Sequence, residues 1–166
     1  MRRIKEENGD VMIITAAVLT VLIFFAGIAT DLVLIYMEHS RLENYCQLAR
    51  ESRFSHEELL MYSGEPAGEI RDIVWDCLRE NGFKGDAQLI FYEDAPLPDM
   101  RHYSVKLTLK KECPWHFLVM FHKDSVQVES SVFFDDCIGE RYSGNRVWHP
   151  EGKDAYYRRE FTGRFL

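Results

Sequence analysis

The chain has 166 residues, of which 46% are hydrophobic, and its formal net charge is −7 at pH 7. This length leaves room for one modest domain with an added anchoring segment, and not for several domains. The acidic balance argues against nucleic acid as the main partner, because the sequence has no basic stripe that could neutralise phosphates.

The first predicted element is an apolar helix near the N-terminus. Residues 11–30 read VMIITAAVLTVLIFFAGIAT and contain no charged residue. As a helix they span about 30 Å, the thickness of the hydrocarbon core of a bilayer. A domain this small has no interior that could surround such a helix, so the segment is predicted to cross a membrane. The apolar run resumes after Asp31 as LVLIYM, which extends the predicted membrane helix over residues 11–37.

A cleaved secretory signal is the alternative for this segment. Arg2, Arg3 and Lys5 would form its basic region, and the small residues at 27–29 a cleavage site. The apolar run is longer than the usual stretch of about 7–15 residues, which favours a permanent anchor. The same basic residues lie in a leader, residues 1–10, that the positive-inside rule assigns to the cytoplasm, with the remaining domain outside.

Asp31 lies near the outer edge of the apolar run and allows two interpretations. It is either an interfacial carboxylate that reaches water, or a contact to a neighbouring subunit's helix, because ionisable groups at membrane depth seek partners. Ala26 and Gly27 are small residues at which another helix could approach closely.

Helical spacing continues beyond the membrane as a stalk, residues 38–63. The apolar stripe that continues from the membrane helix into this stalk consists of Ile35, Leu42, Tyr45, Cys46 and Ala49. The helix is predicted to end at about Arg53. Ser55 and Glu58 fit a capping box, at which the chain would bend and restart.

The predicted outer domain, residues 64–140, begins with a helix at Pro66 that Asn81-Gly82 ends. The hydrophobic period then changes to two, which predicts strands over residues 87–92, 103–110 and 126–132. Residues 115–121, WHFLVMF, fit either a buried strand or a short helix. The predicted fold class is α+β, with a long transmembrane helix that continues as a stalk, a second helix and a small antiparallel sheet of three or four strands.

Four cysteines, Cys46, Cys77, Cys113 and Cys137, form an even set in a domain predicted to lie outside the cytoplasm. Structural disulfides are expected there, and buried thiols are the alternative. Three full pairings are conceivable, and Cys113–Cys137 with Cys46–Cys77 is preferred. The sequence contains no C-x-x-C motif and no clustered zinc ligands.

No motif for catalysis appears, such as H-E-x-x-H, G-x-S-x-G or a phosphate-binding loop. The chain is therefore predicted not to be an enzyme and to have no cofactor, metal or small-molecule substrate. The tail, residues 141–166, is rich in arginine and aromatic residues, which are enriched at protein interfaces. Trp148, Tyr156 and Tyr157 are its candidate interface residues, and a flexible terminus is the alternative.

The first fifty residues resemble the N-terminus of the TadE/TadF-like proteins of tight-adherence (Flp) pilus systems, which are minor pilin-like, or pseudopilin, components. The resemblance lies in a short charged leader ending in Gly9, an apolar helix, and Asp31 leading into LVLIYMEHSRLENYCQLARES. It implies cleavage by a prepilin peptidase between Gly9 and Asp10. The sequence departs from the pilin pattern at Ile14, the fifth mature position, where such proteins usually carry a glutamate.

We therefore expect a pilus assembly component that acts by helix packing and protein–protein contacts. Its expected partners are the membrane and other pilin-like or secretion-platform proteins, and its expected location is the cell membrane of a bacterium, in association with the pilus. The alternative is a single-pass extracytoplasmic binding or sensor module unrelated to pili.

Overall fold

A computed structural model of the chain describes residues 3–93, 100–122, 124–139 and 157–166, with only the backbone described for residues 3–10, 100 and 136–139. The chain forms two compact units. The helix-tip unit comprises Met1–Glu38 and Cys113–Val126, and the sheet unit comprises His39–Glu112 and Gln127–Leu166.

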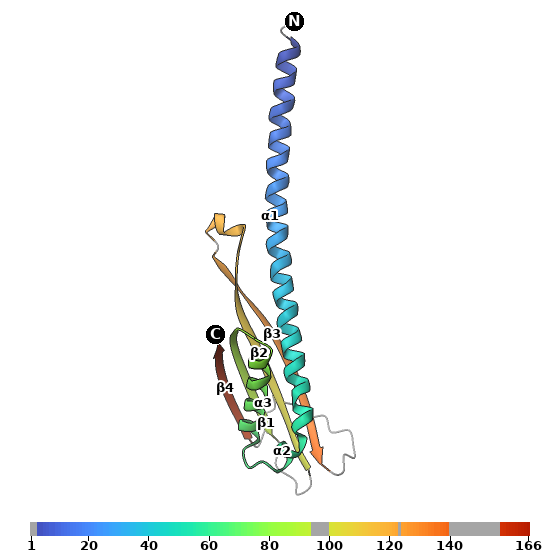
Figure 1. The fold of residues 1–166 in the computed structure, drawn as a ribbon, viewed down its shortest axis with the longest axis vertical. Helices are drawn as coiled ribbons and strands as arrows, with labels where there is room; N and C mark the ends of the chain where they lie inside the picture. The colour runs from blue at the N-terminus through green and yellow to red at the C-terminus, as the bar shows by residue number, and fades with distance from the viewer. Residues whose placement is uncertain (1–2, 94–99, 123, 140–156) are drawn as a thin grey trace. The chain divides into compact units, whose positions relative to one another are not determined.

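The longest element is the helix α1, Arg3–Ser52, drawn from blue to cyan in Figure 1. The sequence contains no proline before Pro66 that could break this helix. The few polar side chains of the apolar part are satisfied locally, because the hydroxyls of Thr15, Thr20 and Thr30 donate to carbonyls four residues earlier over 2.8–2.9 Å. Among the described residues, α1 is the one helix long and apolar enough to cross a membrane.

The chain bends after α1 through a 3₁₀ turn, Arg53–His56, and restarts as the short helix α2, Glu57–Tyr62. The predicted bend is therefore present, but the predicted capping box is wrong. Ser55 donates its hydroxyl backward to the carbonyl of Ser52 at 2.9 Å, and no side chain caps α2.

The helix α3, Pro66–Glu80, begins with proline in its first turn, as predicted. Its C-terminus follows the predicted signal as well. Gly82 adopts a φ of 71°, and the N–H of Phe83 donates to the carbonyl of Leu78 at 2.9 Å, which closes the helix end.

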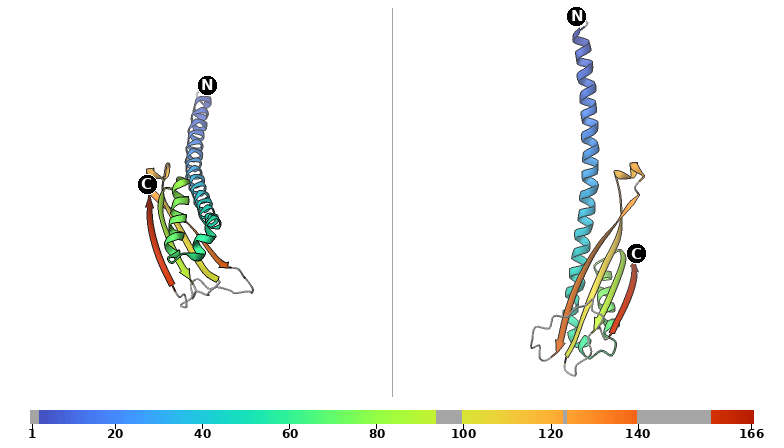
Figure 2. Two further views of the ribbon diagram at one scale, coloured as in Figure 1. Left: turned by 60° about the horizontal axis from the view of Figure 1, so that its bottom comes forward. Right: turned by 180° about the vertical axis from the view of Figure 1, so that it is seen from behind.

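Four strands form one sheet in the order β3-β2-β1-β4, so the expected α+β class is confirmed. Their bounds are β1 Gly85–Glu93, β2 Met100–Pro114, β3 Ser125–Gly139 and β4 Tyr157–Phe165. β1 pairs antiparallel with β2 and β4, with Leu89 opposite Leu107 on one side and Phe161 on the other. Figure 2 shows β4, in red, along the outer edge of β1.

The structure adds a strand in the C-terminal tail and decides between the two alternatives for residues 115–121. The end of the 141–166 tail is strand β4, whose residues alternate between the covered and the exposed face of the sheet. Of the two alternatives for residues 115–121, the buried strand is wrong, because β2 ends at Pro114, and the short helix is present in part as a 3₁₀ turn, Leu118–Phe121.

The core of the sheet unit lies between the sheet, the C-terminal part of α1, and α3. Its buried side chains come from α1 (Leu42, Cys46, Ala49), from α3 (Ile70, Val74, Leu78) and from alternate positions of the strands (Leu89, Phe91, Tyr103, Val105, Leu107, Leu109). This apolar burial holds the sheet unit together.

Candidate functional site: the apolar helix and the Asp31 clasp

From Val11 to Ile23 the apolar part of α1 is exposed around its whole circumference. Leu22, Ile23 and Phe25 are 59%, 60% and 62% exposed, although each would favour burial in a water-soluble protein. Successive helical residues point about 100° apart, so these neighbours cover different sides of the helix. A helix that is apolar all round is stable where its surroundings are also apolar.

At the end of this segment, Asp31 is 1% exposed and accepts hydrogen bonds from three backbone N–H groups. The donors are the consecutive N–H groups of His116, at 3.0 Å to Oδ1, and of Phe117 and Leu118, at 2.9 and 2.8 Å to Oδ2. We call this arrangement the Asp31 clasp, and we call residues 115–122, which it holds, the tip. All of these residues belong to the helix-tip unit.

The clasp forms because the tip begins a helical turn. The first N–H groups of such a turn have no partner within it and attract a carboxylate acceptor. That acceptor normally comes from the preceding residue, whereas here it comes from α1. The chain reverses at His122, which adopts a left-handed φ of 58° and donates its N–H to the carbonyl of Val119 at 3.0 Å.

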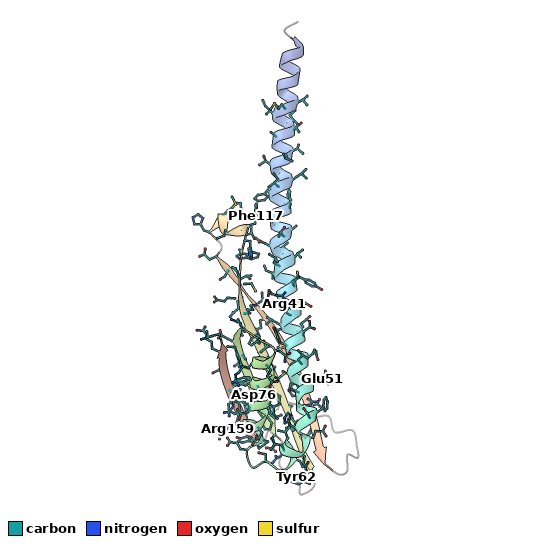
Figure 3. The ribbon with its side chains drawn as sticks, in the orientation of Figure 1. Arg41, Glu51, Tyr62, Asp76, Phe117 and Arg159 are labelled. Atoms are coloured by element: carbon teal, nitrogen blue, oxygen red, sulfur yellow. The ribbon has the colours of Figure 1, made fainter. Side chains whose placement is uncertain are left out.

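Aromatic packing joins the tip to the apolar part of α1. The Phe24 ring lies edge-to-face with the rings of Phe117 and Phe121, each at a centroid distance of 5.7 Å. Gly27 allows the close approach of Phe117, because a Cβ atom at this position would overlap the Phe117 ring. Figure 3 shows the labelled Phe117 side chain directed toward α1.

These contacts change the interpretation of two predicted residues, Asp31 and Gly27. The expectation that Asp31 reaches water is wrong, because the tip covers its carboxylate. Gly27, expected to receive another helix, contacts Phe117 of its own chain, while Ala26 stays exposed. The sequence shows Asp31 and the WHFLVMF segment separately. It gives no sign that they meet, because no local pattern links two segments 85 positions apart.

The remaining candidate residues lie elsewhere. The backbone of Gly9 and Asp10 is part of α1. Tyr157 starts β4 opposite Glu93, and the centroid of its ring lies 6.2 Å from that of Phe91 in an edge-to-face arrangement. Tyr157 therefore belongs to the sheet. Trp148 and Tyr156 lie outside the described residues.

The preferred disulfide Cys46–Cys77 is absent, since both residues are thiols. The Cys46 thiol is buried against the carbonyl oxygen of Ser130, at 3.9 Å. The Cys77 thiol instead lies at the end of α3, where the Asn81 side-chain amide donates to it at 3.8 Å. The two sulfur atoms therefore face different partners. The pairing Cys113–Cys137 falls outside the described residues, because the Cys137 side chain is not described.

A second buried charge lies in the sheet unit. Oε1 of Glu93 is 2.7 Å from Nε of Arg101, and the two side chains are 8% and 16% exposed. Arg101 also donates to the carbonyl oxygens of Leu60 and Ser63 at the end of α2. Burial raises the pKa of Glu93 above its ordinary value, and Arg101 opposes that rise. The pair thus ties β1 and β2 to α2.

The sheet unit also carries a shallow depression of about 320 Å³ over β1, β2 and β4. The charged groups that line it are paired. Lys110 contacts Glu129 at 3.1 Å, and Arg164 contacts Asp86 at 2.9 Å. Within the described part of the chain, no three histidine, cysteine or acidic side chains come together as metal ligands would.

The sequence matches no protein-family model, and comparisons with curated proteins and with solved structures find no match.

Proposed function

We propose that the protein is a single-pass membrane component that acts by helix packing and protein–protein contacts in the assembly of a tight-adherence-type pilus. The observation that carries the membrane part of this proposal is the uncharged 11–30 segment of α1, whose large apolar side chains from Val11 to Ile23 are exposed on all sides. Only a lipid or helix-lined environment stabilises such a surface.

The distribution of basic residues supports an orientation of α1 with its N-terminus in the cytoplasm. Three basic residues, Arg2, Arg3 and Lys5, precede the apolar segment within a few positions, whereas Arg41 and Arg50 follow it more distantly. By the positive-inside rule, the N-terminus lies in the cytoplasm and the sheet unit outside.

The pilus part rests on the leader that ends in Gly9 and on the long helix that carries an outer α+β unit. A prepilin peptidase that cut after Gly9 would remove the hydrophilic leader and leave the apolar helix to pack among pilin helices. Partners are therefore other pilin-like or platform proteins.

Mass spectrometry of the mature N-terminus in the native cell tests this proposal. The wild-type chain is expected to begin at Asp10. The variant Gly9→Leu is expected to keep its leader, because a bulky residue blocks the peptidase site. Gly64→Leu is the matched control, since a Cβ atom at Gly64 meets no atom within 4 Å, and it should mature normally.

Fractionation adds a second readout. The mature chain is expected to co-purify with sheared pili, and the Gly9→Leu chain is expected to stay in the cell membrane. A wild-type chain that retains residues 1–9 and never accompanies pili would contradict the pilus assignment and favour a binding or sensor module.

A further inference from the structure

We infer that the tip is a second lipid-contacting element, which enters the outer hydrocarbon layer beside α1. This inference rests on the proposed membrane anchoring and extends it from one segment of the chain to two. The ligand is the acyl-chain region of a phospholipid bilayer.

The first support is the chemistry of the tip surface. Val119, Met120 and Phe121 are consecutive and are 47%, 70% and 52% exposed. No acidic residue, lysine or arginine occurs between Trp115 and His122. Exposed apolar residues that occur singly need no explanation, but a contiguous group of large ones marks a contact surface.

The second support is the level of the tip along α1. Phe117 packs on Gly27 and Phe24, and Phe121 also packs on Phe24. Phe24 precedes Asp31 by seven residues, which corresponds to about 10 Å along a helix. Half of a hydrocarbon core is about 15 Å thick. A bilayer that surrounds the 11–30 segment therefore also surrounds the tip residues that contact Phe24.

The third support is the hydrogen bonding of the tip backbone. Lipid offers no partner for a free N–H group, so an irregular segment in lipid needs acceptors within the protein. The Asp31 clasp supplies them for His116, Phe117 and Leu118. Met120 donates to Phe117 at 3.2 Å, and Trp115 donates to Asp124 at 3.2 Å.

The residues at the two ends of the tip, with Asp124 just beyond it, suit the membrane–water boundary. Trp115, the first residue of the tip, is half-buried, and His116, His122 and Asp124 are exposed polar groups. Tryptophan is enriched at the level of lipid headgroups, where one part of its ring is apolar and its N–H meets polar partners. The exposed surfaces of the tip and of the apolar part of α1 both consist of large apolar side chains, which argues that both contact lipid.

Lipid photolabelling of the wild-type chain tests the inference. The full-length protein is reconstituted into vesicles of phosphatidylethanolamine and phosphatidylglycerol that contain a phosphatidylcholine with a diazirine in its acyl chain. After irradiation, trypsin releases the tip as residues 112–123 and the apolar helix as the peptide that ends at Arg41. Residues 85–101, which contain β1, set the background.

Labelling above background of both the helix peptide and the tip peptide is the expected result. Labelling of the helix peptide alone would overturn this inference and leave the membrane anchor standing. A second copy of the protein that covers the tip would give this pattern, together with cross-links between the tip and protein. Labelling of neither peptide would overturn the anchor and the inference together.

Matched variants sharpen the readout. Met120→Glu is expected to lower labelling of the tip peptide by about tenfold and to leave the helix peptide unchanged, because a carboxylate avoids hydrocarbon. Leu59→Glu introduces the same charge at an exposed apolar residue of the sheet unit and is expected to change neither peptide. Equal tip labelling in Met120→Glu and wild type would contradict insertion of the tip.

Discussion

The backbone N–H of Leu118 donates to Oδ2 of Asp31 at 2.8 Å, although the two residues lie 87 positions apart in the chain. The neighbouring amides of Phe117 and His116 share the same carboxylate. One buried charge therefore fixes the conformation of the tip on the apolar helix. A buried carboxylate is stable only with such partners, so each side of the contact depends on the other.

Asp31→Ala is expected to release the tip. Hydrogen bonds to a charged acceptor contribute about 1.5–3 kcal/mol each, and every 1.4 kcal/mol corresponds to a tenfold change in an equilibrium. Amide hydrogen exchange at residues 116–118 should therefore accelerate by roughly 10- to 100-fold. Glu51→Ala, which removes an exposed acidic side chain from the same helix, is the control and should leave these amides protected. Unchanged protection in Asp31→Ala would mean that the clasp does not order the tip.

Gly27→Val is expected to displace Phe117, since any Cβ at Gly27 overlaps the Phe117 ring. Overpacking of this kind typically costs about 1–3 kcal/mol. The same exchange experiment should show faster exchange across the tip, whereas Gly64→Val, with no atom within 4 Å of its Cβ, should not. Equal tip protection in both variants would contradict the close approach.

Arg101→Ala is expected to destabilise the sheet unit more than Glu93→Gln does. Loss of the arginine leaves a buried carboxylate without its cation and frees the carbonyls of Leu60 and Ser63, a change that typically costs about 3–5 kcal/mol. Glu93→Gln leaves Arg101 with those carbonyl acceptors. Urea unfolding of both variants in detergent measures the difference.

An exposed ion pair provides the control for that comparison. Asp86→Asn removes the partner of Arg164, at a site where both side chains are at least half exposed, and should cost less than about 1 kcal/mol. If Arg101→Ala cost no more than Asp86→Asn, the buried pair would have no special role in stability.

Alkaline pH is expected to weaken the sheet unit through Cys46. Burial raises the pKa of this thiol to about 11, whereas a thiol in the unfolded chain has a pKa of about 8.5. Between these values the unfolded chain loses a proton that the folded chain keeps, so the free energy of unfolding falls as pH rises. The loss from this one group reaches about 3 kcal/mol, at about 1.4 kcal/mol per pKa unit.

Unfolding of wild type and Cys46→Ala at pH 8 and pH 10.5 isolates that contribution. Loss of the side chain's packing destabilises Cys46→Ala by the same amount at both pH values. Only wild type also loses stability through the thiol as pH rises. The free energies of unfolding of the two proteins should therefore converge at the higher pH. A gap between them that does not change with pH would contradict the raised pKa.

The sequence was sufficient for the elements that local patterns specify. The uncharged 11–30 segment predicted the apolar part of α1, and Pro66 with Asn81-Gly82 marked both ends of α3. Alternation placed β1, β2 and β3, although the structure extends the last two well beyond the predicted residues. The same alternation continues through β4, with Phe161, Gly163 and Phe165 turned inward, and could have identified that strand.

The Asp31 clasp could not be predicted in the same way. Its donors are backbone N–H groups, which leave no trace in residue identity. The contact also joins segments more than 80 positions apart, and local periodicity carries no information at that distance. The Cys46–Cys77 pairing failed for a related reason, because even numbers of cysteines do not fix which sulfur atoms meet.

The membrane anchor is the central claim, and flotation of reconstituted protein on lipid vesicles after alkaline carbonate extraction tests it most directly. Leu22→Lys and Leu48→Lys place the same charge on exposed leucines of α1, inside and beyond the apolar segment. A central lysine opposes insertion by about 2.5–3.5 kcal/mol. Wild type and Leu48→Lys should therefore float with the lipid, and Leu22→Lys should be extracted to a large extent. A wild-type chain that stays in the extract, freely soluble without lipid or detergent, would contradict the account.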